Sequence, residues 1–188
     1  MGQNGACLRA ILTGRTKAPS SATNTGTDPS PAAAAARRSQ EGVMRIDNLH
    51  PVISARLMVV DVDAPLRSAA LSLSRPAIGL VVVCHGSGEA AGVLSKSDLV
   101  RHLANSGPTE APIAALMSRS IVSCGPDDDL HSVWQTMAAQ GLQNVPVLGA
   151  DSKPLGVLDI RDAMKALFKQ EELQERLLAN YISGIGYQ

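Results

Sequence analysis

The stretch Gly92-Val-Leu-Ser-Lys-Ser-Asp-Leu99 returns in a related form as Gly156-Val-Leu-Asp-Ile-Arg-Asp-Ala163, at an offset of 64 positions. The same offset, without a gap, aligns two pairs of preceding segments: Asp63-Ala-Pro-Leu66 with Asp127-Asp-Asp-Leu130, and Val81 and Val83 with Val145 and Val147. A period of 64 residues is longer than that of common solenoid repeats. The sequence therefore predicts two small paired domains rather than a stack of repeats.

Each copy is predicted to contain a strand, a helix, two more strands and a second helix, which is an α/β (α+β) fold of two βαββα units. In the second copy, three aspartates open the first helix, where acidic side chains favour the helix dipole. Gly141 is expected to end that helix, and the last helix is expected to run from about Asp159 to about Ser183. The predicted strands are 57–60, 80–84, 92–94, 121–124, 145–148 and 155–158.

Composition changes near residue 43, and the first 43 residues are rich in Ala, Ser, Thr, Gly and Pro. Such a segment buries too little apolar surface to offset its ordering entropy, so it is predicted to be disordered. Two interpretations of this segment stay open. In the first, it is a disordered tail or sequence upstream of a natural start at Met44. In the second, it is an organelle targeting peptide. The predicted segments are a leader at 1–43, a first repeat at 44–105, a linker at 106–112, a second repeat at 113–170, and a C-terminal helical extension and tail at 171–188.

Composition also excludes several classes of function. The 188 residues carry 17 basic and 17 acidic side chains, and this balance argues against a general nucleic-acid binder, which needs clustered positive charge. The longest apolar run, 77–84, is too short to span a bilayer, so no membrane partner is expected. The three cysteines are far apart and form neither a disulfide framework nor a metal-binding knuckle. They suggest a reducing compartment, so the predicted location is cytoplasmic, or an organelle if residues 1–43 are a targeting peptide.

The doubled pattern resembles the CBS domain family, named for cystathionine β-synthase, over residues 45 to about 170. The resemblance rests on the joint order of short motifs: Gly92 to Leu99, Ala115-Leu-Met-Ser118, Asn144-Val-Pro-Val147, and Pro154 to Asp162. It implies a Bateman module, in which two units pack sheet to sheet about a pseudo-twofold axis and leave two clefts. In this family the clefts commonly hold adenosine-containing ligands such as AMP, ADP, ATP, NAD or S-adenosylmethionine, the units are regulatory rather than catalytic, and separate pairs commonly dimerise.

The resemblance further implies a ligand motif, Gly-x-x-Ser/Thr-x-x-Asp, which is complete in the first copy as Gly92, Ser95 and Asp98. A carboxylate there accepts hydrogen bonds from both ribose hydroxyls, and the serine hydroxyl adds another. The neighbouring Lys96 is expected to meet a phosphate. Apolar contacts with the adenine ring are expected from Val122, Pro146 and Val147.

In the second copy Gly156 and Asp162 match the motif, but Asp159 replaces the hydroxyl residue. Two carboxylates would repel an approaching phosphate unless Arg161, or a bound cation, compensates them. The first site is therefore the better candidate, and an altered or vacant second cleft is expected as one outcome.

Another interpretation needs no ligand, because Ser95-x-x-Asp98 is also a capping box and Asp159 and Asp162 can cap a helix as well. The sequence offers no nucleophile–base pair, phosphate loop or metal-ligand cluster, so no enzyme is predicted. The leading hypothesis is a non-catalytic homodimeric module that binds an adenosine-containing ligand and transmits energy or metabolite status to an unidentified partner protein. The alternative is a ligand-free CBS dimerisation scaffold with degenerate clefts.

Overall fold

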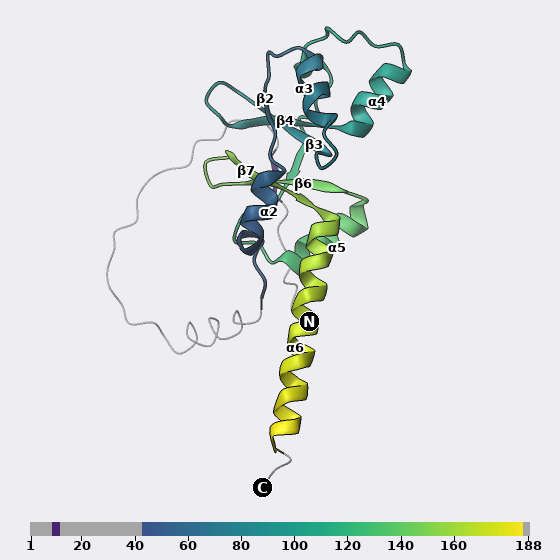
Figure 1. Cartoon of the computed structure of the whole chain (residues 1–188). Coiled ribbons are helices and arrows are strands. Elements are labelled where there is room, and N and C mark those ends of the chain that lie inside the picture. The colour runs from purple at the N-terminus through teal and green to yellow at the C-terminus, as the bar shows by residue number, and fades with distance from the viewer. Residues whose placement is uncertain (1–8, 12–42, 186–188) are drawn as a thin grey trace, which may run out of the picture.

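The computed structural model describes residues 9–11 and 43–185 (Figure 1). The first copy consists of β2 (Val59–Asp61), α3 (Leu66–Leu73), β3 (Leu80–Cys84), β4 (Ala90–Ser95) and α4 (Lys96–Ala104). The second copy consists of β5 (Ile121–Ser123), α5 (Leu130–Gln140), β6 (Asn144–Leu148), β7 (Pro154–Asp159) and α6 (Ile160–Ile185). The remaining elements are β1 (Arg9–Ile11), the 3-10 helix η1 (Ile46–Leu49), α2 (His50–Ala55) and the 3-10 helix η2 (Ile113–Ala115). The predicted α+β order of strand, helix, strand, strand and helix is thus confirmed in both copies.

Helix α5 shows how the sequence sets the ends of these elements. The Asp129 carboxylate accepts hydrogen bonds from the main-chain N–H groups of His131 at 3.4 Å and Ser132 at 3.1 Å, which satisfies donors that the helix itself cannot. Gly141 ends the helix in the left-handed conformation, with φ of +65°. The predicted acidic start and glycine end are both confirmed.

The two copies form small sheets with the same local geometry. Strands β2, β3 and β4 lie in that order, with β2 parallel and β4 antiparallel to β3. In the second copy β6 pairs with β7. The chain at the end of β5 lies beside β6, because the main-chain oxygen of Cys124 accepts a hydrogen bond from the N–H of Leu148 at 2.9 Å. The irregularity between Val83 and Cys84 recurs 64 positions later, between Val147 and Leu148. The two copies therefore correspond at an offset of 64 residues in the structure as well as in the sequence.

The sheets lie face to face at the centre of the molecule, with helices on both outer sides (Figure 1). Because side chains alternate along a strand, β3 and β6 each serve two cores, which explains why they are apolar at nearly every position. Side chains that face the helices are Val81, Val83, Val145 and Val147. Side chains that meet between the sheets include Leu80, Val82, Cys84 and Leu148.

The segments that precede each copy pack on the opposite copy. In η1 and α2, the fully or almost fully buried side chains of Ile46, Leu49 and Ile53 complete the core around α5, β6 and β7. Ile113 of η2 is buried in the core of the first copy. The sequence analysis did not predict η1, α2 or η2. This exchange couples the two copies, and it crosses the boundaries at 105 and 113 that the sequence suggested.

The N-terminal segment is described at Arg9–Ile11 and at Val43. Residues 9–11 form β1, which pairs antiparallel with β5 so that Ala10 lies opposite Val122. This differs from the expected disorder at these three positions, because β5 offers them main-chain hydrogen bonds. The rest of the predicted leader lies outside the described residues, and the proposals made for it stay predictions.

Helix α6 begins in the core of the second copy and projects far beyond it (Figure 1). The large apolar side chains exposed along its outer part are Leu173, Leu177, Leu178, Tyr181 and Ile182. Despite its length, neither α6 nor any other helix of the described ranges is apolar enough to cross a membrane.

Candidate functional site

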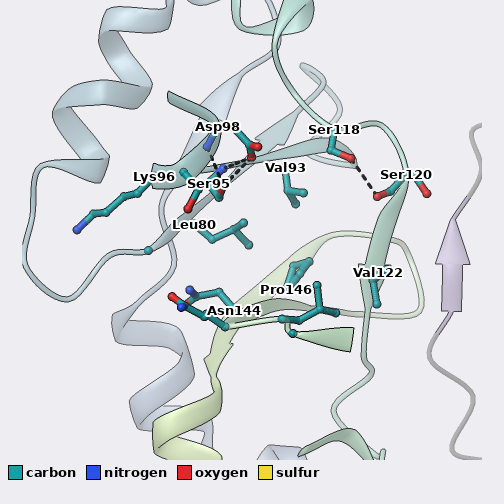
Figure 2. A pocket seen from close by; sticks show the side chains of 15 residues that line it. Leu80, Val93, Ser95, Lys96, Asp98, Ser118, Ser120, Val122, Asn144 and Pro146 are labelled. Carbon is teal, nitrogen blue, oxygen red and sulfur yellow. Dashed lines mark hydrogen bonds between the residues drawn. The ribbon is translucent and has the colours of Figure 1, made fainter. Parts of the chain in front are cut away.

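A cleft of about 390 Å³ opens between the two sheets and receives side chains from both copies (Figure 2). Leu80 and Val93 form its wall in the first copy, and Val122 and Pro146 face them from the second. Polar side chains at its ends are Ser95, Lys96, Asp98, Ser118, Ser120 and Asn144. An apolar lining with a few polar groups is typical of a site for a small molecule.

At one end of the cleft, β4 runs directly into α4, and this junction fixes Ser95 and Asp98. The Asp98 Oδ2 atom accepts hydrogen bonds from Ser95 Oγ at 2.6 Å and from Ser95 N at 3.1 Å, while Ser95 Oγ accepts from Asp98 N at 3.2 Å (Figure 2). These bonds form the capping box that the sequence allowed. The motif is therefore rigid before any ligand arrives.

Capping leaves part of the Asp98 carboxylate for other partners. Its Oδ1 atom accepts a hydrogen bond from Arg101 Nη1 at 3.2 Å, and that arginine side chain is largely exposed. An exposed ion pair of this kind contributes little stability, so a ligand hydroxyl can replace it at small cost. The two roles of Asp98, as a cap and as an acceptor for a ligand, are therefore compatible through different oxygens.

On the facing wall, at the same end as Ser95 and Lys96, lies Asn144, which the sequence analysis did not select (Figure 2). Its Oδ1 atom is buried and has no hydrogen-bond partner among the described residues. Gly79 makes room for this amide, because a Cβ atom at Gly79 would lie 2.5 Å from Asn144 Nδ2. A buried acceptor without a donor is costly, and the Asn144 side chain lines the cleft. The available signal was a polar residue at the start of an apolar strand, two positions before Pro146.

Lys96 lies at the mouth of the cleft and extends away from Asp98 (Figure 2). Its Nζ donates a hydrogen bond to the main-chain oxygen of Arg75 at 3.1 Å. To meet a phosphate, as expected from the sequence, the flexible side chain has to give up that bond.

Three predicted site residues have other neighbours. A Cβ atom at Gly92 would lie 2.8 Å from the main-chain oxygen of Ser118, so this glycine admits the chain of the second copy. At Gly156 the equivalent neighbour is the backbone of Ile53, at 2.7 Å. Val147 is fully buried on the helix side of β6, because alternation along the strand turns it away from the cleft side, where Pro146 lies.

Asp159, Asp162 and Arg161 gather at the junction of β7 and α6, the counterpart of the first site. Arg161 clamps Asp159, with Nε 2.9 Å from Oδ1 and Nη2 2.7 Å from Oδ2. These hydrogen bonds hold the pKa of the Asp159 carboxyl below its usual range, although burial opposes them. Asp162 pairs with Arg56, a residue that the sequence analysis did not select, at 2.6 Å between Nε and Oδ2.

Among residues 9–11 and 43–185, no three His, Cys, Asp or Glu side chains lie where they would hold a metal ion. The carboxylates at the two sites accept hydrogen bonds from the side chains of Ser95, Arg101, Arg161 and Arg56.

Comparisons with known proteins agree with this architecture. A family model described as CBS domain matches residues 46–105 and 113–169. The chain is 21% identical over 135 residues to an uncharacterised 17.7 kDa protein of Acidianus ambivalens, a match that covers 72% of this chain and 82% of that protein. It is 26% identical over 124 residues to the arabinose 5-phosphate isomerase GutQ of Escherichia coli, covering 66% of this chain but 36% of GutQ. The chain thus spans about a third of that enzyme.

Two solved structures show the same fold. The CBS domain pair of protein MJ0100, in complex with 5′-methylthioadenosine and S-adenosyl-L-methionine, has a TM-score of 0.59 at 17% identity, and the match covers 69% of this chain and 98% of that one. The CBS domain protein PAE2072 from Pyrobaculum aerophilum, complexed with AMP, has a TM-score of 0.57 at 22% identity, covering 63% and 89%. With two adjacent family matches that together span more than half of its length, the chain belongs to the CBS domain family and contains a tandem pair of these domains.

Proposed function

We propose that this protein is a non-catalytic regulatory module that binds one adenosine-containing ligand in the cleft between Asp98 and Asn144. The observation that carries the proposal is the cleft itself. It has apolar walls from both sheets, an Asp98 oxygen that accepts from an exposed arginine on the first wall, and on the facing wall an Asn144 oxygen that has no partner among the described residues. Two proteins of the same fold are complexed with adenosine compounds, which supports this class of ligand.

The polar groups of the two facing walls suggest how such a ligand lies. Ribose hydroxyls are donors that suit the Asp98 carboxylate and the Ser95 hydroxyl. The exocyclic amine of adenine is a donor that suits Asn144 Oδ1, and the ring would lie between Leu80 and Pro146.

Because the cleft is built from both copies, a bound ligand stabilises one arrangement of the two sheets over others. This is the basis on which the module would report AMP, ADP, ATP, NAD or S-adenosylmethionine to a partner protein. Within the described part of the chain, Cys84 and Cys124 are buried free thiols, which supports a reducing compartment such as the cytoplasm.

Titration calorimetry of the full chain, shown to be folded and nucleotide-free, tests the proposal with these five ligands and with GMP. We expect saturable binding of at least one adenosine compound, and affinity lower by at least about tenfold in Asp98→Ala, since hydrogen bonds to charged groups are the stronger ones. The matched control is Asp129→Ala, which removes a helix cap of similar geometry from α5, away from the cleft. Heat from none of the adenosine compounds, or equal losses in both variants, would contradict the proposal.

A second candidate function is a dimerisation scaffold, and the exposed apolar side chains between Leu173 and Ile182 on α6 favour it. If this helix forms the seam of a homodimer, deletion of residues 171–188 will halve the mass measured by light scattering and leave ligand binding intact. A dimer of unchanged stoichiometry in the truncated chain would exclude α6 as the seam.

A further inference from the structure

The two ligand sites of the pair differ at two positions that the offset of 64 residues brings into correspondence. At the offset of 64, Arg56 corresponds to Ser120, which lines the first cleft, and Asp159 and Asp162 correspond to Ser95 and Asp98. The second copy therefore has a long cation where the first has a small hydroxyl group. It also has an additional carboxylate where the first has a serine.

The Arg56 side chain reaches the second site from the end of α2. Its Nε lies 2.6 Å from Asp162 Oδ2 and its Nη1 lies 3.8 Å from Asp159 Oδ2. Nη1 also donates a hydrogen bond to the main-chain oxygen of Ala77 at 2.5 Å, so the guanidinium is held by both copies. The Arg56 side chain is 18% exposed and that of Asp159 is 4% exposed, whereas Arg161 on the outside is 70% exposed.

These contacts engage both oxygens of Asp159 and one oxygen of Asp162. Asp159 Oδ1 accepts from both Arg161 N and Nε, and Asp159 Oδ2 accepts from Arg161 Nη2. Asp162 Oδ2 accepts from Arg56. A ligand entering here would have to displace the guanidinium of Arg56 and leave it without its partners, which is costly for a mostly buried charge.

We propose that Arg56 occupies the second cleft in place of a ligand and thereby limits the protein to one adenosine-containing ligand per chain. The limit of one rests on the proposed function, whereas the occupation of the cleft by Arg56 does not. Arg56 thus acts as an internal substitute for a bound cation. Its charge compensates two carboxylates that would otherwise face each other in a poorly solvated space.

The stoichiometry of binding tests this proposal first. We expect one ligand per wild-type chain and two per chain in the double variant R56S/D159S, which copies the first cleft into the second. Addition of Asp98→Ala to the double variant should leave one ligand per chain, bound at the second site. Two ligands per wild-type chain would overturn the proposal, as would a folded double variant that still binds one. The wild-type result needs no variant, so the proposal remains falsifiable if the double variant does not fold.

Thermal denaturation tests the occupied cleft without any ligand. In Arg56→Ala the melting temperature at pH 7 should fall by about 10 °C, since one partner of a mostly buried ion pair is lost. The control is Arg45→Ala, which breaks an exposed pair with Asp127 and should shift the melting temperature by less than about 2 °C.

The pH dependence of the melting temperature distinguishes two causes of destabilisation in Arg56→Ala, the loss of charge compensation and the loss of packing. The charged groups around Arg56 are Asp159, Asp162 and Arg161. Because the hydrogen bonds of Arg161, with a smaller contribution from the charge of Arg56, lower the pKa of Asp159 in the folded chain, the stability from this carboxylate is complete above its unfolded pKa of about 3.9 and is lost as the pH falls through its folded pKa. The difference between wild type and Arg56→Ala should therefore shrink as the pH falls from 5 to 3. Equal melting temperatures at pH 7, or a difference independent of pH, would overturn the proposal. If the wild-type chain binds no nucleotide, the proposed function fails, and this thermal result alone decides whether Arg56 fills the cleft.

Discussion

At the scale of single residues, Asn144 shows a conflict between stability and binding. Its unpaired buried oxygen destabilises the ligand-free protein, and the equivalent position of the first copy holds Leu80. We predict that Asn144→Leu raises the free energy of unfolding by roughly 1–2 kcal/mol and weakens ligand binding by at least about tenfold. Chemical denaturation and calorimetry measure the two effects on the same protein.

The control for Asn144→Leu is Gln135→Leu, at an exposed position of α5. It should change the free energy of unfolding by less than about 0.5 kcal/mol and leave binding unaltered. If Asn144→Leu binds ligand as tightly as the wild type, then Asn144 takes no part in recognition, and the orientation proposed for the ligand is wrong.

The buried thiols give a second prediction at this scale. Burial, with a smaller contribution from the nearby Asp128, raises the pKa of Cys124 to about 12, and burial also raises the pKa of Cys84. The stability contributed by the neutral thiols is complete below the unfolded pKa of about 8.5 and is lost as the pH rises toward 12. With Cys7 replaced by serine, we expect no reaction with a disulfide reagent at pH 8 in the folded chain and two thiols after denaturation. Rapid labelling of the folded chain would contradict the burial of these side chains.

At the scale of elements, the close contact of α2 with β7 depends on Gly156. A Cβ atom there would lie 2.7 Å from the main-chain carbon of Ile53, and backbone cannot move aside as a flexible side chain can. We predict that Gly156→Ala costs about 1–3 kcal/mol of stability. Gly86→Ala is the control, because nothing lies within 4 Å of its added Cβ, and denaturant titration should show almost no change. Equal stability of both variants would contradict the packing of α2 on β7.

The elements also show what the sequence can and cannot predict. Strands such as β3 and helices such as α5 were predictable because apolar runs and caps at Asp129 and Gly141 act locally. The first motif was predictable for the same reason, since Ser95 and Asp98 lie within one turn. Helix α2 was missed because Ile53 completes a core formed by residues far away in sequence, and Arg56 was missed because its partners lie in the other copy. The only sequence signal for Arg56 was its alignment with Ser120.

At the scale of the whole molecule, the exchanged segments make the two copies fold as one unit. Ile53 precedes the first copy in sequence but is 1% exposed within the core of the second, next to Trp134. We predict that Ile53→Ala costs about 2–5 kcal/mol and that fluorescence of the single tryptophan, which reports on the second copy, changes together with the circular dichroism of the whole chain. The neighbouring Val52, which is 44% exposed, is the control position, where alanine should have a small effect.

Separate transitions in these two signals would mean that the copies unfold independently, contrary to the observed packing. A coincident transition would also explain how a ligand in one cleft reaches the whole molecule. Since β3 and β6 each contribute to two cores, a change in the angle between the sheets alters contacts on both outer sides. In the proposed function, that angle is the property that a partner protein senses.

The central claim is that one adenosine-containing ligand binds between Asp98 and Asn144 while Arg56 fills the opposite cleft. A crystal structure of the full chain with the ligand that binds most tightly in calorimetry tests it most directly. We predict one ligand per chain, ribose hydroxyls at the Asp98 carboxylate, the ring amine at Asn144, and Arg56 still paired with Asp162. An empty first cleft at saturating ligand, or a ligand in the place of the Arg56 guanidinium, would contradict the account.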